Sequence, residues 1–120
     1  MIAKTSISIH EDNLELLTEA CQKYGMNAWK LVNTLARAYF IQIQSSDIIL
    51  EKRTCSYQKL PGEYIIYSIE FAKENFENLH SYRLSRRVSV SGLTGDLICM
   101  ADFLMEFLDK LVRNGKNGNN

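Results

Sequence analysis

The N-terminal residues 4–10 alternate between two kinds of side chain, as a β-strand does. One face carries Thr5, Ile7 and Ile9, and the other carries Lys4, Ser6, Ser8 and His10. A single short strand has two backbone edges without partners and one apolar face to bury. This strand constrains the fold most, because it needs both a second strand and a layer of helices.

Two amphipathic helices are expected directly after the strand. From Glu11, apolar residues recur at helical spacing as far as Tyr24, and Gly25 is a residue that commonly ends a helix. Asn27 is a good N-cap for a second helix that reaches about Gln44. A strand and two helices of roughly forty residues cannot build a core of their own. We therefore expect this unit, residues 1–46, to complete its core by dimerising with a second copy of itself.

A small sheet and a final helix are expected over residues 47–113. β-Branched and aromatic residues dominate 48–59 and 63–71, and the reverse-turn residues between these two stretches predict a hairpin. One or two helical turns are expected over 72–79, and a polar strand over 82–91. The final helix is expected from about Thr94 to Arg113, with a seam that packs on the sheet or pairs with another subunit. The seam consists of Leu97, Ala101, Leu104, Leu108 and Leu111.

The remaining expectations concern the organisation of the chain. The tail, residues 114–120, is rich in Gly and Asn and is predicted to be flexible. Residues 86–91 faintly echo the N-terminal strand, but the second helix of such a unit is missing, so no internal repeat is expected. The fold class is α+β.

The first forty-four residues resemble the ribbon-helix-helix family of bacterial and phage repressors, which includes Arc-, MetJ- and CopG-like proteins. The stretch Lys4–Ile9 is similar to the strand of CopG-type members, and Leu14 and Leu17 fall at core positions of the family. Gly25-Met26-Asn27 resembles the family's turn, and Tyr39 lies where an aromatic residue is often found. The resemblance implies an intertwined homodimer in which two copies of the strand pair antiparallel across a two-fold axis.

The resemblance also implies sites on double-stranded DNA. By position, Lys4, Ser6 and Ser8 read base edges in the major groove. The first turn of the second helix contacts phosphate through Asn27, Ala28, Trp29 and Lys30. The implied function is sequence-specific DNA binding as a homodimeric transcriptional repressor. Arg83, Arg86 and Arg87 form the most basic stretch and are a possible second phosphate contact.

Charge and topology leave alternatives open. The chain has 14 basic and 14 acidic residues and a net charge of +0, so no global field favours a polyanion. In one alternative, the N-terminal unit only dimerises, and an adaptor, antitoxin or relaxosome accessory protein acts through its C-terminal part. In another, residues 4–10 form an ordinary edge strand of the C-terminal sheet.

Catalytic and metal chemistry have no support in the sequence. Cys21, Cys55 and Cys99 include no CxxC pair, and neither His10 nor His80 has a partner at metal-ligand spacing. We therefore expect no enzyme, no metal and no cofactor. Neither a leader peptide nor a membrane-spanning segment is expected, which predicts a cytoplasmic protein with reduced thiols.

Overall fold

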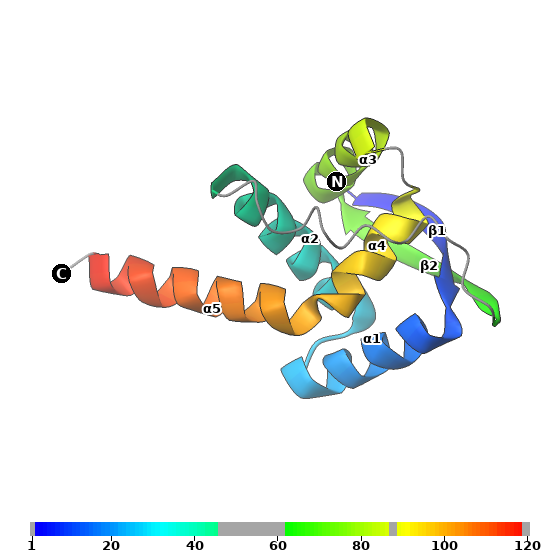
Figure 1. Ribbon diagram of the computed structural model, residues 1–120, viewed down its shortest axis with the longest axis horizontal. Coiled ribbons are helices and arrows are strands. Elements are labelled where there is room, and N and C mark those ends of the chain that lie inside the picture. The colour runs from blue at the N-terminus through cyan, green and yellow to red at the C-terminus, as the bar shows by residue number, and fades with distance from the viewer. Residues whose placement is uncertain (1, 46–61, 87–88, 119–120) are drawn as a thin grey trace.

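The structure is a computed structural model that describes residues 2–45, 62–86 and 89–118 (Figure 1). Its elements in chain order are β1 (Ile2–His10), α1 (Glu11–Tyr24), α2 (Ala28–Ser45), β2 (Tyr64–Ala72), α3 (Lys73–Arg86), α4 (Val90–Cys99) and α5 (Ala101–Gly118). The α+β class is confirmed, and so is the strand followed by two helices at the N-terminus.

The partner of β1 is β2 of the same chain. The two strands form a two-stranded antiparallel sheet in which Ser6 lies opposite Ser68. This pairing agrees with the alternative of a sheet shared with the C-terminal part, and it takes the place of the expected pairing of β1 with a second copy of itself. The first strand of the predicted hairpin, residues 48–59, lies outside the described residues.

The described elements form a repeat of one strand and two helices. The elements β2, α3 and α4 begin 62 residues after β1, α1 and α2 respectively (64 − 2, 73 − 11 and 90 − 28). Both strands have 9 residues, and α1 and α3 both have 14. The expectation of no internal repeat is therefore wrong, because the second unit begins at Tyr64 and not near Arg86.

The buried side chains follow the same repeat. Every buried residue described in the second unit and in α5 has a buried counterpart 62 positions earlier. The pairs are Ile7 and Ile69, Ile9 and Phe71, Leu17 and Leu79, Leu31 and Leu93, Val32 and Thr94, Leu35 and Leu97, Ala36 and Ile98, Ala38 and Met100, Tyr39 and Ala101, and Gln42 and Leu104. The two units thus present the same pattern of faces to a common core.

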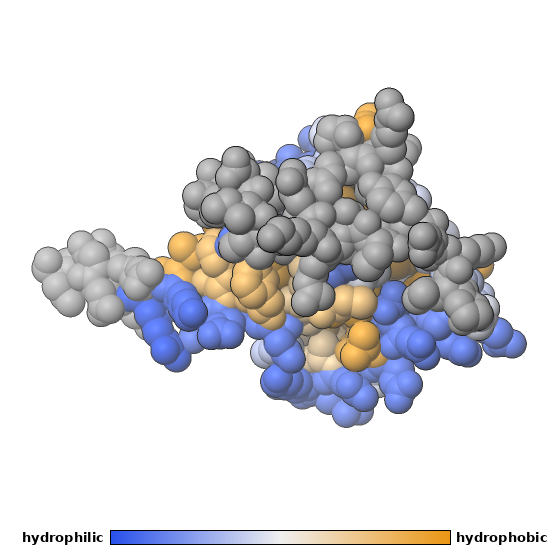
Figure 2. Space-filling model, viewed as in Figure 1, coloured by the Kyte–Doolittle hydropathy of each residue, from blue (hydrophilic) through white to orange (hydrophobic). Residues whose placement is uncertain are grey.

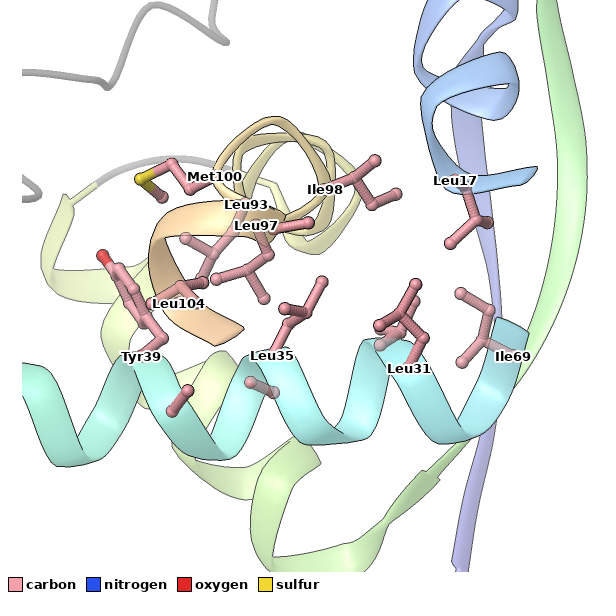
Figure 3. Close-up of a cluster of buried hydrophobic side chains, with 14 of the residues drawn as sticks. Leu17, Leu31, Leu35, Tyr39, Ile69, Leu93, Leu97, Ile98, Met100 and Leu104 are labelled. Atoms are coloured by element: carbon pink, nitrogen blue, oxygen red, sulfur yellow. The ribbon is translucent and has the colours of Figure 1, made fainter. Parts of the chain in front are cut away.

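The two units are interlocked around that core. The helix α2 contacts α4, and each of them also contacts the strand and the first helix of the opposite unit. Figure 3 shows Leu35 and Tyr39 of α2 facing Leu93 and Leu97 of α4 and Leu104 of α5, while Leu31 lies toward Ile69 and Leu17. Residues from both sides of the expected boundary at 46/47 therefore share one core.

The C-terminal half differs from the sequence expectations in two places. Residues 82–86 belong to α3, and α4 begins at Val90, so the expected strand over 82–91 is wrong. The expected single helix from Thr94 to Arg113 is two helices, because the chain leaves helical geometry at Met100 (φ −98°, ψ 15°). The helix α5 then extends away from the core and includes most of the predicted flexible tail (Figure 1).

The expected leucine seam is divided between the core and the surface. Leu97, Ala101 and Leu104 are buried within the chain, whereas Leu111 is exposed. Figure 2 shows apolar residues on the side of α5 toward α2 and polar residues on the opposite side. The first half of the seam therefore packs within the chain.

Candidate nucleic-acid interface

The β1–β2 sheet has one buried and one exposed face. Alternate residues such as Ile7 and Ile69 point into the core. The residues between them point to the other face of the sheet. On that face, Lys4, Ser6 and Ser8 of β1 lie across from Glu70, Ser68 and Ile66 of β2, respectively. We call these six residues the ribbon face. Its two central serines and Lys4 are exposed, and Ile66 is 72% exposed.

The first turns of α2 cover the outer edge of β2. The indole Nε1 of Trp29 donates to the carbonyl oxygen of Ser68 at 2.9 Å. Asn33, one turn further along the helix, donates to the carbonyl of Glu70 at 2.9 Å and accepts from the amide of Ala72 at 2.8 Å. Backbone groups at the sheet edge that would otherwise need a further strand are thus bonded to side chains of a helix.

The start of α4 covers the outer edge of β1 in the same way. The backbone N–H of Ser8 donates to the Ser91 hydroxyl at 2.9 Å. Ser91 is the counterpart of Trp29 in the repeat, because the two residues are 62 positions apart. The ribbon therefore has the beginning of a helix at each of its two edges.

Both of these helix beginnings have the same cap. The Asn27 side chain accepts from the backbone N–H of Lys30 at 2.8 Å, and the Ser89 side chain accepts from that of Gly92 at 2.9 Å. These bonds fix the first turn of each helix. The amide-rich, positive ends of α2 and α4 consequently flank the ribbon face, where they suit an anion.

The structure brings most of the predicted DNA-contact residues together. Lys4, Ser6 and Ser8 share the ribbon face, and Lys30 is exposed in the first turn of α2 beside it. Of the other predicted phosphate contacts, Asn27 is exposed and holds the helix cap, and Ala28 is half-buried. Trp29 is 39% exposed, with its indole N–H bonded to the sheet.

The predicted basic patch stays a prediction, but its described residues do not lie in the expected strand. Arg83 and Arg86 lie in α3 and not in a strand, and Arg87 lies outside the described residues. Sequence reasoning also missed Ile66, Ser68 and Glu70 on β2, together with the N-terminus of α4. The signal that would have found them is the offset of 62 residues that relates each one to a predicted site residue.

A second polar cluster ties α1 to α5 and does not involve the ribbon. The Asp102 carboxylate accepts from the Tyr24 hydroxyl and from Lys23 Nζ, and these two bonds lower the pKa of Asp102. The same bond to Asp102 raises the pKa of Lys23, while burial is the main cause of the raised pKa of Tyr24. Lys23 and Asp102 neutralise one another as a structural ion pair, and the uncharged Tyr24 hydroxyl adds a hydrogen bond to it.

Metal-ligating side chains and the Cys21 thiol are further groups that could form a site. They contain no group of three His, Cys, Asp or Glu residues arranged to hold a metal ion. Burial raises the pKa of the Cys21 thiol, which disfavours the nucleophilic thiolate. No described helix is long and apolar enough to span a membrane.

Comparisons with known proteins identified no relative of this chain. No protein-family model matches the sequence, and no curated protein or solved structure is significantly similar to it.

Proposed function

We propose that the chain is a single-chain ribbon-helix-helix protein that binds double-stranded DNA in a sequence-specific manner. The observation that carries the proposal is the exposed ribbon face with a helix N-terminus at each edge. Two antiparallel strands lie about 5 Å apart. A ribbon of that width fits the major groove of B-DNA, which is about 12 Å wide.

The side chains of the ribbon face have the chemistry that base readout requires. Lys4 donates to guanine O6 and N7, and the Ser6 and Ser68 hydroxyls can donate or accept at any base edge. These three side chains are exposed, so contact with DNA does not require the core to rearrange. The ribbon face supplies specificity.

The N-termini of the two flanking helices position the protein on the DNA backbone. The N-termini of α2 and α4 face opposite edges of the ribbon, so each one can meet a phosphate on one wall of the groove. Lys30 adds a positive charge at the α2 end. A protein that occupies a short operator in this way acts as a transcriptional repressor.

The zero net charge sets the character of the binding. Among the described residues, Lys4 and Lys30 are the cations placed at the proposed interface, and the chain has no net charge. Few counterions are therefore released, and non-specific affinity is low. The affinity then depends on base contacts more than on salt. The homodimer expected from the sequence is not needed for the ribbon, because one chain provides both strands.

The test begins with selection of bound duplexes from a random pool, followed by fluorescence anisotropy on the enriched sequence and on a scrambled duplex. We expect Ser6→Ala with Ser68→Ala to reduce the preference for the enriched sequence by about tenfold, since a good base contact discriminates by roughly 1–3 kcal/mol. The matched control is Ser81→Ala, at an exposed serine on α3. Unchanged preference in the ribbon double variant would refute the proposal.

The phosphate contact is tested separately by its salt dependence. Lys30→Ala is expected to weaken binding to both duplexes by the same factor and to reduce the salt slope by about 1. Lys110→Ala removes the same charge from α5 and should leave the slope unchanged, because Lys110 pairs with Glu106 on an exposed helix face. If the two variants had equal salt slopes, the start of α2 would not contact DNA phosphate.

A further inference from the structure

The two halves of the ribbon face are equivalent in position and different in chemistry. The offset of 62 residues makes Lys4 the counterpart of Ile66, Ser6 that of Ser68, and Ser8 that of Glu70. Only the central pair has the same side chain in both halves. One half thus carries a cation and two hydroxyls, and the other carries an exposed apolar group, a hydroxyl and a carboxylate.

We infer that the ribbon recognises a non-palindromic DNA site, in which one half-site suits Lys4 and Glu70 at one end of the ribbon and a different half-site suits Ser8 and Ile66 at the other end. The inference rests on the proposed function and names its target more narrowly. It assigns specificity to Ile66 and Glu70.

The base preferences of the two halves follow from their functional groups. Lys4 donates hydrogen bonds to guanine, whereas Ile66, 72% exposed, can make only apolar contact, for which the thymine methyl group is the partner. Glu70 accepts a hydrogen bond from cytosine N4, whereas Ser8 can donate or accept. An inverted repeat would therefore satisfy only one end of the ribbon.

The beginnings of the two flanking helices also differ in chemistry. Lys30 in the first turn of α2 corresponds to Gly92 in α4, so only one of the two helix ends adds a side-chain cation. The phosphate contacts are consequently unequal as well. Covalent linkage of the two units keeps this asymmetry in every molecule, whereas a homodimer of identical strands presents the same side chains to both half-sites.

The experiment compares the full-length wild-type chain with a variant whose two ribbon halves carry the same outward side chains. Ile66→Lys with Glu70→Ser gives the second half the residue types of the first. Both proteins are used to select duplexes from one random pool. The wild type is expected to enrich a site without two-fold symmetry, and the variant an inverted repeat of the half-site read by Lys4.

A charge-matched control is necessary because the double substitution raises the net charge by two: it adds one lysine and removes one glutamate. Glu19→Ser with Gln22→Lys makes the same change at exposed positions of α1 and is expected to enrich the wild-type site. The variant should also bind the inverted repeat at least tenfold more tightly than the wild type does. Thermal unfolding of all three proteins establishes that they are folded.

The results of the selection distinguish failure of the inference from failure of the proposed function. A palindromic site enriched by the wild type overturns the inference and leaves DNA binding intact. A double variant that folds and still enriches the wild-type site also overturns it, because Ile66 and Glu70 then do not specify bases. Enrichment of no sequence by the wild type overturns the proposed function and the inference together.

Discussion

Thr94 carries a hydroxyl at a position where the first unit carries a methyl group. Its counterpart is Val32, and both side chains are fully buried. Within the described part of the chain, Thr94 Oγ1 has no hydrogen-bond partner. A buried hydroxyl without a partner costs about 1–3 kcal/mol, and valine has nearly the same shape without that cost.

Thr94→Val is therefore expected to stabilise the protein, raising the free energy of unfolding by about 1 kcal/mol. The reciprocal change, Val32→Thr, is the control and should lower it by a similar amount. Urea denaturation followed by circular dichroism measures both. A loss of stability in Thr94→Val would show that the hydroxyl is bonded in the folded protein.

At the scale of elements, the Asn33 side chain forms the hydrogen bonds to the edge of β2 that a neighbouring strand would otherwise form. Besides its bonds to Glu70 and Ala72, its Oδ1 accepts from Asn75 Nδ2 at 2.9 Å, so a single side chain joins α2, β2 and α3. The counterpart of Asn33 is Gly95, which has no side chain to offer. The edge of β1 depends instead on Ser91.

Asn33→Ala is expected to cost about 2–3 kcal/mol of stability, because it leaves a strand carbonyl and a strand amide without their partner. Thr34→Ala is the matched control, since the Thr34 hydroxyl bonds only within its own helix, to the Lys30 carbonyl at 2.7 Å. Hydrogen exchange should also become faster at the Ala72 amide in Asn33→Ala. Protection of that amide equal to wild type would contradict this account of the sheet edge.

The elements of the first unit were predictable because each has a local signal. Alternation marks β1, helical spacing marks α1 and α2, and Gly25 ends α1 with the left-handed conformation (φ 64°) expected of a helix C-cap. In the second unit, β-branched and aromatic residues over 63–71 mark β2, but the end of α3 and the start of α4 lack such signals. The serines and β-branched residues over 85–91 favour a strand locally, yet the burial of Leu79 and Leu93 in the shared core keeps the flanking segments helical.

The repeat was hidden for a related reason. Over the two units, the paired positions with identical residues are Ser6 and Ser68, Ile7 and Ile69, Asn13 and Asn75, Glu15 and Glu77, Leu17 and Leu79, Leu31 and Leu93, and Leu35 and Leu97. The paired core positions share burial but not always residue size or polarity, as Tyr39 with Ala101 and Gln42 with Leu104 show. Exposed positions are free to differ, so the ribbon-face residues of β2 could not be recognised from those of β1.

At the scale of the whole molecule, the sequence indicated that the N-terminal unit cannot complete its sheet and core by itself, and a second copy was the expected partner. The unit that completes them proved to be part of the same chain. Under the proposed function, the covalent link between the two units means that no second chain has to assemble on the DNA.

The mass of the protein–DNA complex tests the central claim, that one chain forms the entire DNA-binding ribbon. Native mass spectrometry of the protein with its enriched duplex is expected to show one chain of 13.8 kDa per duplex. The same mass should be observed over a range of protein concentrations. A complex that requires two chains on one site, or the absence of any complex with the enriched duplex, would contradict the account.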